Sequence, residues 1–174
     1  AEPTEGFALP GGVFYEHGAE AGRVALLFPG QGSQRLDMGA DIAMAFDAAA
    51  STWDRAASVE LEAGTPLHEV VFPRPVFTPE EEEQQRARLT STLWAQPGLA
   101  VTSLSYLSLL RAVGIEPDCV GGHSYGEVTA LCAAGVIDET AMLRVARRRG
   151  ELMASASDVP GAMTAVATDI DTVR

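Results

Sequence analysis

A serine set between two glycines is the residue whose type and spacing best fit covalent catalysis. Gly122-His123-Ser124-Tyr125-Gly126 matches G-x-S-x-G, the spacing of a sharp strand-to-helix turn that projects a serine hydroxyl from the edge of a sheet. Such a serine attacks a carbonyl carbon when a base removes its proton and N–H groups stabilise the oxyanion. Ser124 is therefore the candidate nucleophile. The alternative is an ordinary turn with a solvent-facing serine.

The general base is not identified by the sequence. His123 adjoins Ser124, but neighbouring side chains on a sharp turn point in different directions, so we predict a structural hydrogen bond for His123. His17 and His68 have no sequence context that marks them as the base. The sequence thus predicts a nucleophile without its base.

Four arginines lie on one segment with helical periodicity, residues 138–154. They are Arg144, Arg147, Arg148 and Arg149. Because side chains of one helix point in different directions, at most one or two of them can face a pocket. For the cluster alone, a solvated helix face is the favoured interpretation.

Charge limits the partners that the chain can bind. The 174 residues carry a net charge of −12, and all 12 basic residues are arginine. A chain this acidic repels nucleic acid and anionic membrane surfaces. An anionic ligand would need a local basic pocket.

Targeting and metal signals are absent from the sequence. It has no run of 18 apolar residues and no basic segment near its start, so we expect neither a membrane span nor a signal peptide. Two cysteines, Cys119 and Cys132, are too few for a disulfide framework, and we predict that both are buried packing residues. No cofactor motif or metal-ligand spacing occurs. A cytoplasmic location is expected.

The elements needed to position Ser124 alternate between strands and helices. Apolar runs predict strands at 23–28, 118–122 and 162–167. Helices are predicted over 38–59, from the Thr78 cap onward, from Pro97 to 113 with Gly114 ending the helix, over 127–134, and over 138–154 with Asp138 as the cap. Residues 1–22, rich in Gly, Pro and Glu, are interpreted as a linker. This order predicts an α/β architecture.

Five motifs, taken in order, resemble one family. They are Phe28-Pro29-Gly30-Gln31-Gly32-Ser33-Gln34, Gln96-Pro97, Gly122-His123-Ser124-Tyr125-Gly126-Glu127, Gly135-Val136-Ile137 and Arg149-Gly150-Glu151-Leu152-Met153. Together they resemble the malonyl-CoA:acyl carrier protein transacylases and the acyltransferase domains of polyketide and fatty acid synthases. The resemblance runs from about Val24 to Arg174, and details such as Tyr125 are similar to iterative synthases of the enediyne type.

The resemblance implies a fold and a division of the chain. The fold is an α/β-hydrolase-like core with a short parallel sheet and a nucleophile elbow, plus the start of a small ferredoxin-like subdomain. Residues 1–22 would be a linker, 23–160 the N-terminal part of the core, and 161–174 the first strand region of the truncated subdomain.

The resemblance also implies a ping-pong acyl transfer. Ser124 would take an acyl group, malonyl being favoured, from coenzyme A and pass it to the phosphopantetheine thiol of an acyl carrier protein. The backbone N–H groups of Gln31 and Tyr125 match the oxyanion hole. Arg149 matches the residue that binds the free carboxylate of the extender, which suits the paired N–H donors of arginine.

Two departures from the family qualify this reading. The family's histidine base has no counterpart here, so we expect it on a complementary C-terminal part of the same domain. Tyr125 stands where aliphatic residues or glutamine are usual, and an aromatic ring there would crowd a methyl branch, which favours malonyl. A serine hydrolase and a non-catalytic fragment are the alternative functions.

Overall fold

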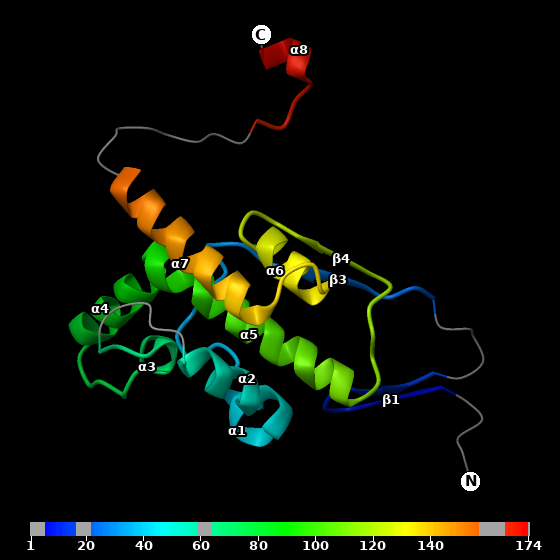
Figure 1. The fold of residues 1–174 in the computed structure, drawn as a ribbon. Coiled ribbons are helices and arrows are strands. Elements are labelled where there is room, and N and C mark those ends of the chain that lie inside the picture. Colours follow the sequence, from blue (N-terminus) through cyan, green and yellow to red (C-terminus); the bar gives the residue numbers. More distant parts are fainter. Residues whose placement is uncertain (1–5, 17–21, 59–63, 157–165, 174) are drawn as a thin grey trace.

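Two parallel strands lie beside helices arranged around one long helix (Figure 1). The computed structural model describes residues 6–16, 22–58, 64–156 and 166–173. Strand β3 (Ala25–Phe28) pairs in parallel with β4 (Cys119–Gly122), and Phe28 is in register with Gly122. The loops that follow both strands therefore leave from the same edge of the sheet, where ligands bind in parallel sheets. The α/β architecture is confirmed.

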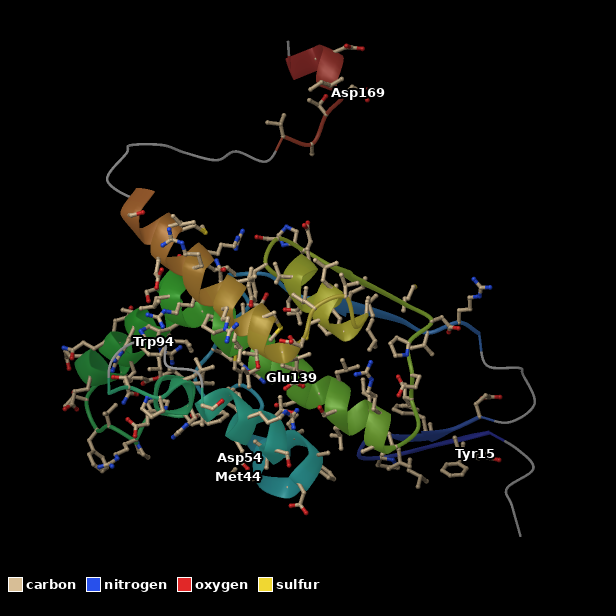
Figure 2. The ribbon with its side chains drawn as sticks, viewed as in Figure 1. Tyr15, Met44, Asp54, Trp94, Glu139 and Asp169 are labelled. Atoms are coloured by element: carbon tan, nitrogen blue, oxygen red, sulfur yellow. The ribbon has the colours of Figure 1, made fainter. Side chains whose placement is uncertain are left out.

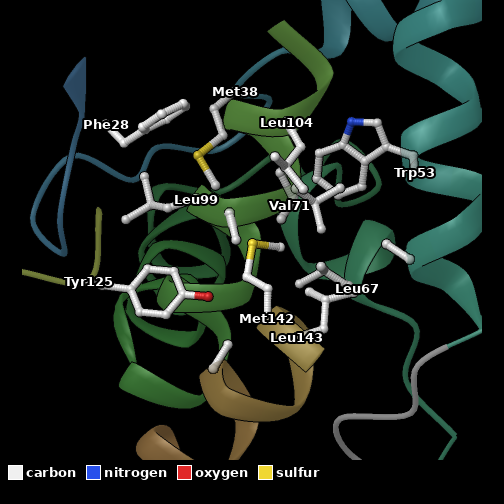
Figure 3. Packing of buried hydrophobic residues seen from close by; sticks show 14 of the residues in the cluster. Phe28, Met38, Trp53, Leu67, Val71, Leu99, Leu104, Tyr125, Met142 and Leu143 are labelled. Atoms are coloured by element: carbon white, nitrogen blue, oxygen red, sulfur yellow. The ribbon is translucent and has the colours of Figure 1, made fainter. Parts of the chain in front are cut away.

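Helix α5 (Thr92–Ala112) is the centre of the core. Every residue from Trp94 to Thr102 is buried, because other helices cover α5 on several sides. Those that pack on it are α1 (Ala40–Ala45), α2 (Asp47–Ala57), α3 (Leu67–Val71), α4 (Pro79–Thr90), α6 (Gly126–Ala133) and α7 (Glu139–Ala156). Figure 3 shows Leu99 and Leu104 of α5 together with Met142 of α7 in this core.

A charged pair joins two of these helices. Glu139, the first residue of α7 (Figure 2), accepts hydrogen bonds of 2.8 and 3.0 Å from Arg55 of α2. Both side chains are exposed at the surface, so the pair fixes geometry more than it adds stability.

Three helix boundaries agree with the sequence signals. Thr78 caps α4 by accepting a hydrogen bond from the Glu81 amide, with Pro79 at the first helical position. Gly114 follows α5 in the left-handed region, at φ 82°. Asp138 caps α7 by accepting a 2.6 Å hydrogen bond from the Ala141 amide. In each case a short local pattern decides the boundary.

Two helix predictions are wrong. The segment predicted as one helix, 38–59, forms α1 and α2, because Phe46 is extended (φ −135°, ψ 121°) between them. The helix predicted to begin at Pro97 begins at Thr92, and Pro97 lies inside it. Proline there removes the bond to the Leu93 carbonyl, and the burial of the surrounding turn outweighs that loss.

The ends of the chain differ from the sequence prediction. The segment predicted as a linker contains a hairpin of β1 (Phe7–Leu9) and β2 (Val13–Tyr15). Gly11 and Gly12 make its turn at φ 104° and 83°. The strand predicted over 162–167 falls mainly outside the described residues, and 166–169 form no strand before α8 (Ile170–Val173).

Candidate active site

Ser124 lies in a strained turn between β4 and α6. It is exposed and has φ 55°, a left-handed conformation that is rare for a residue with a side chain. The flanking glycines are required by close backbone contacts. A Cβ on Gly122 would lie 2.1 Å from the Gly126 carbonyl carbon, and one on Gly126 would lie 2.1 Å from the Phe28 carbonyl oxygen. The turn thus combines a left-handed serine with two glycines that leave no room for a side chain.

The loop after β3 packs directly on this turn. A Cβ on Gly30 would lie 2.4 Å from the His123 carbonyl oxygen and 3.0 Å from the Ser124 Cβ. The His123 amide donates a 3.0 Å hydrogen bond to the Phe28 carbonyl. Gln31 follows Gly30 directly in this loop, so its backbone continues from the contact with the serine turn.

Two backbone amides, those of Gln31 and Tyr125, lack an acceptor in the described structure. Within the described parts of the chain, neither the Gln31 amide nor the Tyr125 amide donates a hydrogen bond to another group. Tyr125 also precedes the first turn of α6, where unpaired N–H groups favour negative charge. The two amides are thus available to a developing oxyanion.

Arg149 differs from its neighbours on α7 in its partners. Arg147 and Arg148 both donate to Glu151, at 2.9 and 3.1 Å, and these hydrogen bonds lower the pKa of the Glu151 carboxyl. Arg149 has no acidic partner among the residues described. Its guanidinium carbon lies 6.0 Å from the centroid of the Tyr125 ring. Arg149 is therefore free to bind a carboxylate.

Gly150 brings α7 close to the start of α5. A Cβ at Gly150 would lie 3.0 Å from the Leu93 Cα and 3.2 Å from the Thr92 carbonyl oxygen. This approach fixes Arg149 relative to α5. A surface hollow of about 410 Å³ lies along α7 and is lined by Val145, Arg148, Arg149, Leu152 and Met153.

The Tyr125 side chain points into the core. It is 0% exposed and packs in the same core as Leu99 and Met142 (Figure 3). Burial raises the pKa of its hydroxyl, which has no hydrogen-bond partner within the described ranges. The predicted crowding of a methyl branch is wrong, because no ligand atom reaches a ring that is sealed from solvent.

The remaining predictions for histidine and cysteine are mixed. His123 is exposed and makes no side-chain hydrogen bond with any described residue, so its predicted structural bond is wrong. His68 is exposed on α3, and His17 lies outside the described residues. Cys119 is exposed in the described structure, contrary to prediction. Cys132 is half-buried, and burial raises the pKa of its thiol to about 11.

Gln96 belongs to a motif of the resemblance, but the sequence assigned it no role. It is 0% exposed on α5, and its amide nitrogen is 3.3 Å from the Gln31 side-chain oxygen. The signal for it was a polar residue within the otherwise apolar stretch 93–101 of the helix. In the described ranges, no group of three metal-ligating side chains occurs and no helix is long and apolar enough to cross a bilayer.

Comparisons with known proteins agree on one family. Residues 25–174 match the model of the acyl transferase domain. The malonyl CoA-acyl carrier protein transacylase of Bacillus subtilis is 39% identical over 147 residues, covering 83% of this chain and 42% of that protein. Polyketide synthase GfsA of Streptomyces halstedii is 37% identical over 150 residues, covering 86% of this chain and 2% of GfsA.

A solved structure has the same fold over most of the chain. It is a malonyl-transacylase, PlMCAT, in complex with AntF, the acyl-carrier protein of a type II polyketide synthase. It matches with a TM-score of 0.65 and 38% sequence identity, covering 80% of this chain and 40% of that one. The chain thus spans less than half the length of these relatives.

Proposed function

The chain belongs to the acyl transferase domain family, and from that premise we propose that it carries the nucleophile half of a polyketide synthase acyltransferase. The reaction is a ping-pong transfer. Ser124 takes an acyl group from coenzyme A and then gives it to the phosphopantetheine thiol of an acyl carrier protein. Relatives whose names include malonyl-CoA and acyl carrier protein support these partners.

The chemistry proceeds in two balanced steps. The Ser124 oxygen attacks the thioester carbonyl carbon while a base takes its proton, and the carbon–sulfur bond breaks to release coenzyme A as its thiol. The carrier thiol then attacks the acyl-serine, and the serine hydroxyl is restored. Each step passes through an oxyanion that the Gln31 and Tyr125 amides would stabilise.

One observation carries this proposal. Gly30 touches the Ser124 turn so closely that any side chain at position 30 would overlap the His123 carbonyl. The loop that carries Gln31 is therefore held against the turn that carries Ser124 and Tyr125, and in the described structure neither the Gln31 amide nor the Tyr125 amide has an acceptor. A nucleophile and two donors in this arrangement fit acyl transfer.

We further propose that Arg149 binds the free carboxylate of a malonyl group. Its lack of an acidic partner in the described chain, beside Arg147 and Arg148 that share Glu151, supports this role. A guanidinium binds a carboxylate through two parallel N–H···O hydrogen bonds. The preference for malonyl therefore depends on Arg149, with no contribution from the size of Tyr125.

The missing base is proposed to come from a complementary C-terminal part of the same domain. Leu27 in β3 is 81% exposed although parallel sheets are normally covered on both faces. We assign residues 23–160 to the N-terminal part of an α/β-hydrolase-like core, 161–174 to the start of a ferredoxin-like subdomain, and 1–22 to the segment before the domain. The complementary part would cover Leu27 and place a histidine at Ser124.

The test uses the complete domain with labelled malonyl-CoA, with and without carrier protein. We expect label on Ser124 and its transfer to the carrier thiol. Ser124→Ala should lower labelling at least ~10⁴-fold, while Ser51→Ala, an exposed serine on α2, should leave it unchanged. Release of malonate to water at the same rate with and without carrier would instead identify a hydrolase. No label on Ser124 would identify a non-catalytic fragment.

A further inference from the structure

The side chain of Gln96 connects two elements of the proposed site from inside the core. It is 0% exposed, and its amide nitrogen lies 3.3 Å from the Gln31 side-chain oxygen and 3.6 Å from the Met153 sulfur. Gln31 belongs to the loop after β3. Met153 is on α7, one helical turn beyond Arg149. Gln96 thus contacts both the loop after β3 and helix α7, which carries the proposed carboxylate-binding residue Arg149.

The Gln31 side chain is bound at both of its polar atoms. Its nitrogen donates to the Thr92 hydroxyl at 3.2 Å, and its oxygen accepts from Gln96. Both partners lie in the first two turns of α5, and Gly150 packs against the same turns. The loop, α5 and α7 therefore meet at one point, with Gln31 fixed between Thr92 and Gln96.

Gln96 lowers the stability of the fold at its buried position. Its side-chain oxygen is buried without a hydrogen-bond partner in the described structure. An unpaired buried acceptor destabilises a protein, and an apolar residue of similar length would avoid that penalty. A local conflict of this kind is typical of a functional position.

We propose that Gln96 is a positioning residue for acyl transfer. By binding the Gln31 side chain it holds the Gln31 amide against the Ser124 turn, so that the amide meets the oxyanion at hydrogen-bond distance. This inference rests on the proposed function, because it takes the Gln31 amide as an oxyanion donor. It predicts that Gln96 acts only through the Gln31 side chain.

A double-mutant cycle in the complete domain tests this directly. Gln31→Ala removes the anchored side chain but keeps the backbone N–H, and Gln96→Leu removes the anchor. Losing an oxyanion donor costs about 10²–10³-fold in kcat, so misplacing one should cost about tenfold. We expect each single variant to lower kcat about tenfold with KM for malonyl-CoA little changed, and the double variant to match either single variant.

A matched control separates this role from general packing. Ser105→Ala alters another fully buried polar residue of α5, which bonds the Val101 carbonyl at 2.9 Å. It should lower thermal stability and leave kcat unchanged. If Gln96→Leu changes the melting temperature but not kcat, or if the two losses in kcat multiply, the proposal is wrong.

Acylation of Ser124 by a p-nitrophenyl ester distinguishes failure of the proposed malonyl transfer from failure of the proposed role of Gln96. The burst of nitrophenol reports attack by Ser124 without malonyl or a carrier. If the wild type shows the burst but transfers no malonyl, the proposed function fails, and the cycle measured on the burst still decides the role of Gln96. If Ser124 takes up neither acyl group, both are overturned.

Discussion

The two sides of this molecule differ in how completely they are packed. On the helical side, Leu99 of α5 is 4% exposed within a core shared with α2 and α7. On the sheet side, Leu27 of β3 is 81% exposed and Cys119 of β4 is also open. The candidate nucleophile lies at the end of the open sheet. The candidate nucleophile is therefore located where the described chain is least completely packed.

The difference follows from how helices and parallel strands form hydrogen bonds. A helix satisfies its own backbone, so α5 needs only apolar neighbours, which this chain supplies. A parallel strand needs partners on its edges and cover on its faces, and β3 has β4 as its one partner strand in the described structure. In the described structure the sheet is thus the part whose edges and faces are least satisfied.

Shortening one leucine on each side to alanine tests the difference, and the variant on the helical side should give the largest change in the free energy of unfolding. Leu99→Ala should cost about 2–5 kcal/mol of unfolding free energy, because it leaves a cavity in the core. Leu27→Ala should cost less than about 0.5 kcal/mol in this chain alone, since its side chain is in water. Urea unfolding measures both.

The same Leu27→Ala substitution should have a larger effect in the complete domain. There Leu27→Ala should also cost about 2 kcal/mol or more, because the complementary part would bury it. Equal costs for Leu27→Ala in the short chain and in the complete domain would mean that nothing covers β3.

The sequence predicted the strand, turn and helix around Ser124 because their determinants are local. Two glycines, a preceding apolar strand and a following helix specify the turn, and the structure places Ser124 at φ 55° as that pattern requires. Helix caps at Thr78 and Asp138 were predicted for the same reason. The hairpin at the start was missed although Gly11 and Gly12 carried its turn signal.

Features that depend on distant packing were not predictable. The break at Phe46 and the helical setting of Pro97 are decided by burial against other elements, which no local pattern encodes. The direction of the Tyr125 side chain depends on the path of α5 and α7. The exposure of Cys119 depends on what packs against β4, which the local sequence does not encode.

Replacing Arg149 tests the proposed carboxylate-binding residue, and the expected effect is of intermediate size. Arg149→Ala should lower the preference for malonyl over acetyl groups about tenfold, because a bidentate pair with a charged group contributes roughly 1.5–3 kcal/mol. Competition between labelled malonyl-CoA and acetyl-CoA in the complete domain measures this ratio.

Arg148 is the matched control on the same helix. Its guanidinium is exposed and donates to Glu151 at 3.1 Å, so Arg148→Ala should leave the ratio unchanged. Equal effects of the two variants would place the specificity in the overall charge of α7 and remove Arg149 from the proposed site.

Tyr125→Phe should give the smallest change, and in the stabilising direction. The Tyr125 hydroxyl is buried without a described partner, so removing it should raise stability by about 1 kcal/mol. Tyr106→Phe, at an exposed ring on α5, is the control and should change nothing. Because the Tyr125 ring is sealed in the core, the malonyl-to-methylmalonyl ratio should stay constant, and a shift in that ratio would show that residue 125 does reach the acyl group.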